Sequence, residues 1–236
     1  MEIQTNKALT DKQQFRYEIL QWCGNMEDAK KAYSFIMGED KKPQQAQLPK
    51  SAIEDGVYLV HANGKFTLFE HEYTKVDNME SEVVAIGLKM GEFSIEIALH
   101  DEANGEAITL TTKGNGTSDN DKNYYLNSYD DAVADIDGAD NTDHLRSILN
   151  PKIQLDEEWY IPSLGEMCRI FINKKIINEA LDYVKGDRLR DEWYWTSTEG
   201  SATGAWGLNL NDGSTFNWYT KASYAFRVRA VSAFIL

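Results

Sequence analysis

The side chains that could carry out catalysis or hold a metal ion are few and scattered. The histidines form no His-x-x-x-His pair, so the ligand spacing of a zinc hydrolase is absent. There is no Gly-x-Ser-x-Gly nucleophile motif and no Gly-x-x-x-x-Gly-Lys phosphate loop. Adjacent carboxylates such as Glu157 and Glu158 are typical of a solvated surface. The sequence therefore predicts a protein that is not an enzyme and has no catalytic residues.

Calcium needs a separate test, because residues 119–140 are rich in Asp and Asn. The stretch Asp135-Ile136-Asp137-Gly138 resembles part of an EF-hand loop. In that register the first and twelfth ligand positions fall on Val133 and His144, which supply no carboxylate. We therefore expect no EF-hand and no cofactor or metal, with a non-standard calcium site in 119–140 as the alternative.

A binding surface is the other chemistry that the sequence offers, in the strand pattern of residues 193–231. Side chains along a strand alternate between two faces. The apolar set, expected to face the core, is Trp206, Leu208, Leu210, Phe216 and Trp218. The polar set, expected to face outward, is Gly207, Asn209, Asn211, Asn217 and Tyr219.

Loops 199–204 and 220–223 flank this polar face and add Ser201, Thr203 and Ser223. Tyrosine gives rigid contact area, and small polar residues give adaptable hydrogen bonding, as in many binding surfaces. Alternation alone leaves two interpretations open, an ordinary solvated strand face and a ligand-binding face.

The elements that position this face begin after a different kind of segment, residues 1–46. A capping pair, Thr10 and Gln13, precedes apolar residues at helical spacing that run to Ile36. Gly24 and Asn25 interrupt the run and favour two short helices that dock on a partner; a short coiled-coil seam is the alternative. Residues 41–49 are polar and bounded by prolines, which indicates a linker.

Beyond the linker the hydrophobic period changes from helical to two. Residues 57–60 and 66–69 predict a hairpin with a left-handed turn pair at Asn63-Gly64, and 83–88 pairs with 93–99. Residues 101–140 predict a long surface loop, followed by a helix from Asn141 to Leu149.

In the C-terminal part, Ser163 and Glu166 form a Ser-x-x-Glu capping box that predicts a helix ending at Gly186. Strands are expected at 193–198, 205–211, 215–219 and 224–231. Asp212-Gly213 predicts a two-residue turn between the second and third of them.

Composition limits the partners. The chain has 236 residues and a formal charge of −14, so it repels phosphate backbones, and we expect neither nucleic-acid binding nor membrane insertion. Cys23 and Cys168 make no metal or disulfide spacing and predict buried free thiols. The first residues lack a basic and an apolar signal region, which predicts no secretory signal.

Four segments carry a resemblance to a known family: 159–166 (WYIPSLGE), 193–199 (WYWTSTE), 205–214 (AWGLNLNDGS) and 224–231 (YAFRVRAV). Together they resemble C-type-lectin-fold domains of gut bacteria and their phages, whose relatives include retroelement-diversified ligand-binding proteins. The resemblance covers roughly residues 50–236. It implies an α+β fold with antiparallel hairpins and two helices, preceded by the short helical segment.

The resemblance also implies where a ligand binds. The family's diversified positions correspond here to eight residues: Ser201, Thr203, Gly207, Asn209, Asn211, Asn217, Tyr219 and Ser223. The Glu-Pro-Asn and Trp-Asn-Asp signatures of calcium-dependent lectins are absent, so calcium-mediated sugar binding is not implied. Formylglycine-generating oxidases share the fold, but their paired catalytic cysteines have no counterpart here.

These observations lead to one expectation and one alternative. We expect a phage virion protein of the head or of a tail fibre, acting as a homo-oligomer. In it, residues 1–46 contact other virion proteins, and residues 47–236 bind a host-surface glycan or protein. The alternative is a bacterial diversified ligand-binding or scaffold protein of the same fold, either cytoplasmic or exported by a non-classical route.

Overall fold

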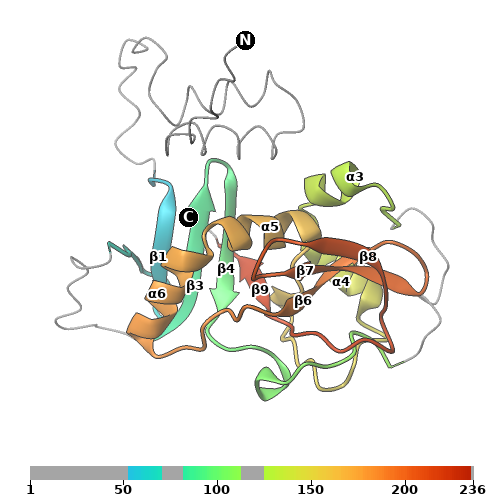
Figure 1. Ribbon diagram of the computed structural model, residues 1–236. Coiled ribbons are helices and arrows are strands. Elements are labelled where there is room, and N and C mark those ends of the chain that lie inside the picture. Colours follow the sequence, from blue (N-terminus) through green and yellow to red (C-terminus); the bar gives the residue numbers. More distant parts are fainter. Residues whose placement is uncertain (1–52, 71–81, 113–124, 235–236) are drawn as a thin grey trace, which may run out of the picture. The chain divides into compact units, whose positions relative to one another are not determined.

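The computed structural model describes residues 53–70, 82–112 and 125–234. From Glu54 onward the described residues belong to one compact unit (Figure 1). The predicted helices of 1–46, the linker and Cys23 lie outside them. The helices and antiparallel sheets of this unit confirm an α+β fold.

Within the described residues, the larger sheet has six strands, all antiparallel, in the order β2-β1-β3-β4-β9-β5. The strands are β1 (Gly56–His61), β2 (Phe66–Leu68), β3 (Val83–Met90), β4 (Phe93–Ala98), β5 (Trp159–Tyr160) and β9 (Val231–Ala233). Both hairpins expected from the period-two pattern are confirmed. Gly64 and Gly91 have positive φ, as their turns require. Asn63 does not have positive φ, so only the glycine of the predicted left-handed pair at Asn63-Gly64 is in the left-handed region.

The smaller sheet carries the predicted binding residues. In the described part of the chain it has three antiparallel strands, β6 (Trp193–Glu199), β7 (Gly204–Asn209) and β8 (Thr215–Thr220), in the order β6-β7-β8. β8 is therefore an edge strand. β7 ends at Asn209 and β8 begins at Thr215, so the connection is longer than the predicted two-residue turn at Asp212-Gly213.

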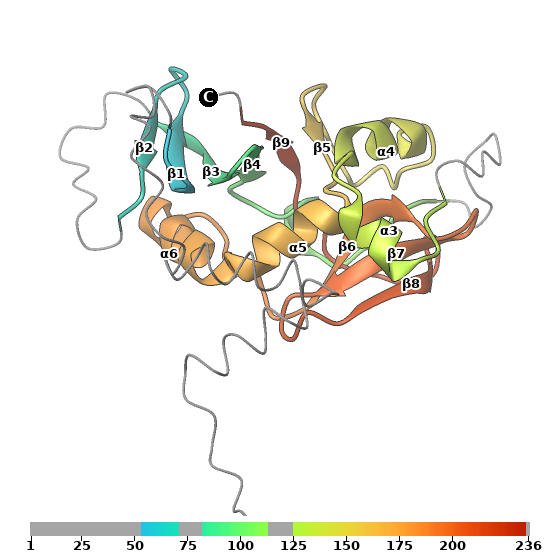
Figure 2. The ribbon, with the colours of Figure 1, turned by 90° about the horizontal axis from the view of Figure 1, so that it is seen from above.

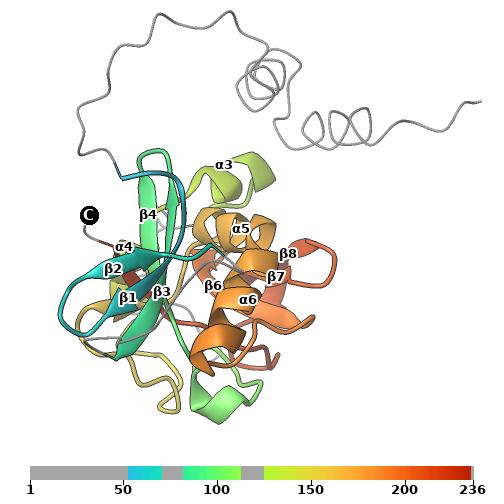
Figure 3. The same cartoon turned by 90° about the vertical axis from the view of Figure 1, so that its left-hand side faces the viewer.

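Two helices lie between the sheets, α5 (Leu164–Ile172) and α6 (Lys174–Val184) (Figures 2 and 3). The single predicted helix is broken at Asn173. The capping box is confirmed: the Ser163 hydroxyl accepts from the backbone N–H of Glu166, whose carboxylate accepts from the N–H of Ser163 at 2.8 Å. Burial raises the pKa of Glu166 to about 7, although the hydrogen bonds from Ser163 and Tyr160 act against this shift.

The helices share one apolar core with both sheets. α6 packs on β1 and β3, and α5 packs on β6 and β7. The core includes Leu59 of β1, Ile86 of β3, Leu164 of α5, Ile177 of α6 and Leu208 of β7, all buried. None of the helices in the described part of the chain is long and apolar enough to cross a bilayer.

The segment expected to be one long surface loop contains helices. A short 3-10 turn, η2, covers Ala103–Gly105, and α3 (Tyr129–Ala134) and α4 (Gly138–Leu145) follow. The Ser128 side chain caps α3 by accepting from Asp131 N–H. The helix predicted at Asn141–Leu149 is α4, which begins earlier, at Gly138 after the N-cap residue Asp137, and ends earlier, at Leu145.

The expectation of a strand over 224–231 is wrong for most of that range. Only its last residue, Val231, belongs to a strand, β9. Phe226 instead makes an isolated bridge with Ile108, and Arg227 makes one with Tyr194 of β6. The alternating pattern reflects a segment that lies along β6, with arginine side chains directed into the interior between the sheets.

The buried arginine of this segment, Arg229, links separate parts of the chain. Its Nε donates to Asp101 Oδ1 at 2.6 Å, and its other nitrogens donate to the carbonyls of Ala98 and Asp187 at 2.8 and 2.9 Å. The Tyr194 hydroxyl donates to the second oxygen of Asp101 at 3.1 Å. The end of β4 and the segment after α6 are therefore tied to the guanidinium directly, and β6 is tied to it through Asp101.

We predict that Asp101→Asn lowers the free energy of unfolding by about 3–5 kcal/mol, because it leaves the Arg229 charge buried without a counter-charge. Urea denaturation measures this. As a control, Lys152→Gln removes an exposed ion pair with Glu106 and should change stability by less than about 0.5 kcal/mol. A loss below about 1 kcal/mol for Asp101→Asn would contradict the role given to this ion pair.

Candidate functional site

The three-stranded sheet is covered on both faces, unlike the predicted sheet with one free polar face. On one face Trp206, Leu208 and Leu210 are buried in the core beside α5, as predicted. The Trp206 indole N–H donates to the carbonyl of Leu126 at 2.7 Å, so the polar N–H group of this ring has a hydrogen-bond partner in the core.

The opposite face is covered by a second apolar cluster. Trp195 of β6, Ala205 of β7 and Phe226 are buried there, and Trp193 and Tyr219 pack against them half-buried. Gly207, expected to face a ligand, is buried in this face. A Cβ built on Gly207 would lie 3.0 Å from Phe226 Cε2, so the missing side chain makes room for Phe226. The assignment of Gly207 to an outward surface is therefore wrong.

The pairing of β7 and β8 decides which rings lie on this face. Gly207 pairs with Phe216 and Ala205 pairs with Tyr219, with a register irregularity between them. Residues paired across two strands share a face, so Phe216 and Tyr219 both lie on the side of Gly207. Tyr219 lies on the face expected for it but is half-buried there against the second apolar cluster, and Phe216 does not lie on the core face with Leu208.

Trp218 also departs from the core assignment. Its side chain is 73% exposed and Phe216 is 39% exposed. The two rings stack with centroids 5.4 Å apart and an angle of 8° between their planes. Alternation along an edge strand distinguishes two faces but does not identify the buried one. For this reason the sequence-based prediction assigned Phe216 and Trp218 to the wrong face.

Further rings extend this stack inward. Phe216 lies 5.8 Å from Trp193, and Trp193 stacks on Phe226 at 5.5 Å. Tyr219 contacts Phe226 and Tyr224, each at 4.8 Å, and Tyr224 is 47% exposed. We call the four rings of β8 and the segment after it, Phe216, Trp218, Tyr219 and Tyr224, the β8 aromatic surface.

The remaining predicted residues lie at two ends of the hairpin. Ser201, Thr203 and Ser223 are exposed at the end where Gly204 pairs with Thr220. Asn209 and Asn211 lie at the other end, where the Asn209 side chain accepts from Asn211 N–H. The structure therefore does not bring all the predicted residues into one surface.

Asn217 lies between the two exposed rings in the sequence and is half-buried. Its amide donates to the carbonyl of Asn127 at 3.2 Å, which ties β8 to the segment before α3.

A buried ion pair anchors the end of the hairpin that carries Ser201 and Ser223. Lys221 and Glu199 pair with their side chains almost fully buried, and His144 Nε2 lies 3.7 Å from the other oxygen of Glu199. Burial raises the pKa of Glu199, and the charge of Lys221 opposes this shift. The pair fixes residue 221, two residues before Ser223, to the last residue of β6.

The sequence predicts no metal site and a buried thiol, and both predictions bear on the described residues. No group of three or more His, Cys, Asp or Glu side chains among them could hold a metal ion; residues 119–124 of the suggested calcium region lie outside this search. Asp135 of that region is occupied by hydrogen bonds from Thr198 and Asn141. Cys168 is buried as a free thiol, as predicted, and burial raises its pKa to about 11.

Comparisons with known proteins bear on the fold alone. No protein-family model matches the chain, and no curated protein matches it. A solved structure, a fimbrial protein from Bacteroides ovatus, is similar with a TM-score of 0.54 and 13% sequence identity. The similarity covers 76% of this chain and 49% of that one, so the chain spans about half the length of that protein.

Trp206 and Trp218, the two tryptophans of the β7–β8 hairpin, are expected to contribute very differently to the free energy of unfolding. Trp206→Ala should lower the free energy of unfolding by about 3–5 kcal/mol, because it empties a core position. Trp218→Ala should change it by less than about 0.5 kcal/mol, because the ring is largely exposed. Thermal or urea denaturation of both variants measures the difference. Equal losses in the two variants would mean that Trp218 is part of the core.

Proposed function

We propose that this protein is a non-enzymatic binding protein whose C-terminal domain, of the C-type-lectin-like type, holds a surface glycan on the β8 aromatic surface. The observation that carries the proposal is the stacked pair of exposed rings, Phe216 and Trp218, on an edge strand. An exposed ring of this size is costly to leave in water, and contiguous exposed apolar groups mark interaction sites.

The chemistry of the surface favours a sugar. One face of a pyranose ring presents C–H groups that pack on an aromatic ring, while its hydroxyls need hydrogen-bond partners. The Tyr224 side chain and the exposed Ser223 beside it offer such partners next to the rings. A protein ligand could use the same rings, and it is the alternative outcome of the binding test.

The proposed assembly is a phage virion, in which residues 1–46 attach the protein to other structural proteins as a homo-oligomer. Several copies of one weak site would give avidity without new contacts. A second candidate is a fimbria, because the similar solved structure is a fimbrial protein. Both assemblies would present the β8 aromatic surface to a cell surface.

The binding test uses the full chain on an array of bacterial surface polysaccharides. Trp218→Ala should weaken binding at least about ten-fold, equivalent to about 1.4 kcal/mol, because it removes the largest exposed ring. The matched control is Tyr129→Ala, since Tyr129 is also exposed but lies beside Trp206, on the other face of the sheet. Its binding should stay within about two-fold of the wild type.

Two outcomes would contradict the glycan proposal. Full binding by Trp218→Ala would place the glycan elsewhere on the protein. Binding of the wild-type chain to protease-treated cells should persist, and its loss would mean that the ligand is a protein.

The two assemblies are distinguished by where the protein occurs. Mass spectrometry of purified phage particles, and of fimbriae sheared from bacterial cells, should find the chain in the phage particles if it is a virion protein. Its presence in fimbriae alone would favour the second candidate. Its absence from both preparations would contradict each proposal of assembly.

A further inference from the structure

The β7–β8 hairpin and the segment after it contain very few charged residues. Residues 200–226 include two, Asp212 and Lys221, in a chain of which 26% of residues are charged. The chain has a formal charge of −14, so nearly all of its acidic residues lie outside this stretch. The β8 aromatic surface is therefore set in a part of the chain that differs sharply in charge from the rest.

Neither of these two residues could bind an anion at the rings. The Lys221 side chain is 1% exposed and pairs with the buried carboxylate of Glu199. Asp212 lies in the connection between β7 and β8, where its side chain accepts from the N–H of Ser214 at 2.9 Å. This hydrogen bond lowers the pKa of Asp212, so its charge stays negative near neutral pH and repels anions.

Two charged residues that flank the interior rings neutralise each other. Glu192 precedes Trp193, and Arg227 follows Phe226. The Arg227 guanidinium donates two hydrogen bonds to the Glu192 carboxylate, at 2.9 and 3.1 Å, and a third to the carbonyl of Gly105. The Arg227 side chain is 9% exposed. The pair therefore brings no net charge to the rings.

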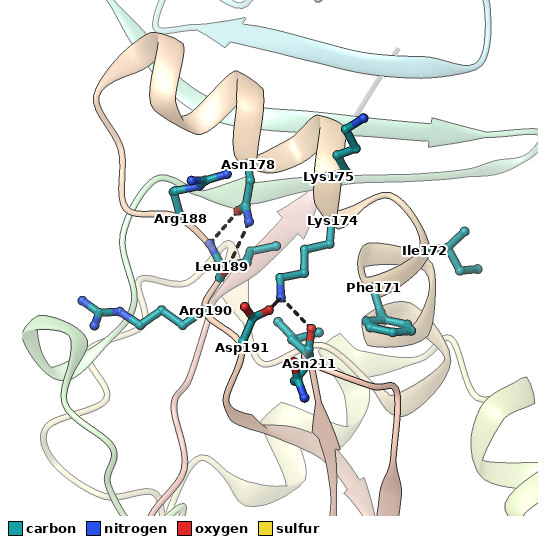
Figure 4. A pocket seen from close by; sticks show the side chains of 11 residues that line it. Phe171, Ile172, Lys174, Lys175, Asn178, Arg188, Leu189, Arg190, Asp191 and Asn211 are labelled. Carbon is teal, nitrogen blue, oxygen red and sulfur yellow. Dashed lines mark hydrogen bonds and ion pairs between the residues drawn. The ribbon is translucent and has the colours of Figure 1, made fainter.

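Arg190 is the basic residue closest to β6 on its N-terminal side. In the described part of the chain it forms no ion pair, so an acidic ligand could use it. Its side chain lies at a cavity beside α6 and extends away from Lys174 and Lys175 (Figure 4). That cavity is also lined by Leu210, which is buried on the face of the sheet opposite the β8 aromatic surface. Arg190 is therefore a competing anion contact that a variant can test.

The hydrogen-bonding groups around the rings are neutral as well. Ser201, Thr203 and Ser223 are exposed. The N–H of Lys221 donates to the carbonyl of Thr203, which brings Thr203 close to the segment that carries Ser223. Among the described residues, no hydrogen bond engages the hydroxyls of Thr203 and Ser223. A hydroxyl both donates and accepts, as a sugar hydroxyl does, whereas a carboxylate only accepts and binds most strongly to cations.

Trp218 has one ring face open to a ligand. Phe216 covers the other face, with the ring planes 8° apart, and the Trp218 side chain is 73% exposed. The face of an aromatic ring carries partial negative charge, so it attracts C–H groups and cations and disfavours carboxylates. A cationic ligand would also need an acidic partner, and Asp212, the acidic residue of this stretch, lies in the connection before β8. The open face therefore fits an uncharged apolar group best.

We propose that the ligand of the β8 aromatic surface is an uncharged polysaccharide of neutral pyranose residues, without carboxylate, sulfate, phosphate or free amino groups. One pyranose ring packs its C–H groups on the open face of Trp218, and its hydroxyls bond to neutral side chains of the rim such as Ser223. This inference rests on the proposed function, because it names the class of glycan that the same surface holds.

Biolayer interferometry of the full chain tests the charge class on the array of bacterial polysaccharides, extended with polymers of known charge. The neutral additions are laminarin, amylose and galactomannan, the acidic ones are polygalacturonate, alginate and hyaluronate, and the cationic one is chitosan. We expect binding to at least one neutral polymer, and this binding should be at least about ten-fold weaker in Trp218→Ala. Acidic polymers and chitosan should bind the wild-type chain at least about ten-fold more weakly than that neutral polymer.

Chemical conversion of the bound neutral polymer separates the effect of charge from that of sugar identity. Oxidation of its primary hydroxyls to carboxylates, with TEMPO and hypochlorite, should weaken binding at least about ten-fold. Reduction of those carboxylates back to hydroxyls is the control for chain damage, and it should restore the affinity to within about two-fold. Equal affinity before and after oxidation would overturn the uncharged class.

The variant Arg190→Gln tests the competing anion contact. Arg190 is exposed, so the variant should fold, and its binding to the neutral polymer should stay within about two-fold of the wild type. A loss of about ten-fold in Arg190→Gln would mean that a charged group of the ligand is held there, and the inference would fail.

The outcomes also separate this inference from the proposed function. Trp218-dependent binding that is tightest for acidic polymers or for chitosan would overturn the uncharged class and leave a glycan site at the rings. Absence of Trp218-dependent binding to every polymer would contradict the proposed function, and this inference with it.

Discussion

The ion pair between Asp101 and Arg229 is the constraint that ties the two sheets together, because Arg229 bonds to Ala98 of β4 and Asp101 accepts from Tyr194 of β6. A guanidinium with no exposed surface needs acceptors for its charge and its N–H groups, and here they come from two separate segments of the chain, at residues 98–101 and at Asp187. The segment that carries Arg229 also carries Phe226, a buried ring that contacts Tyr219 of the β8 aromatic surface.

Local elements could be predicted from the sequence because their signals are local. The Ser163–Glu166 capping box involves groups three residues apart, and a glycine at a tight turn, such as Gly64 or Gly91, is required by its own φ. The expected strand at 224–231 failed because its alternation has a long-range cause. Arg227 and Arg229 are directed to carboxylates more than thirty residues away, and no local pattern distinguishes this from a sheet edge.

The candidate site shows the same limit. Alternation correctly placed Trp206 and Leu208 in the core, and Tyr219 on the opposite face. It could not show that this opposite face is itself covered, because Phe226 and Trp193 come from other segments. Phe216 pairs with Gly207 and stacks on Trp218, so both rings lie on the face opposite Leu208, and the sequence does not mark this cross-strand register.

The edge position of β8 has an evolutionary consequence. Since Trp218 and Phe216 project from the last strand of the sheet, substitutions there alter few interior contacts. If the β8 aromatic surface binds a ligand as proposed, its rings can change while β6, β7 and the buried arginine keep the fold intact. Such a division lets a lineage change its target without rebuilding its fold.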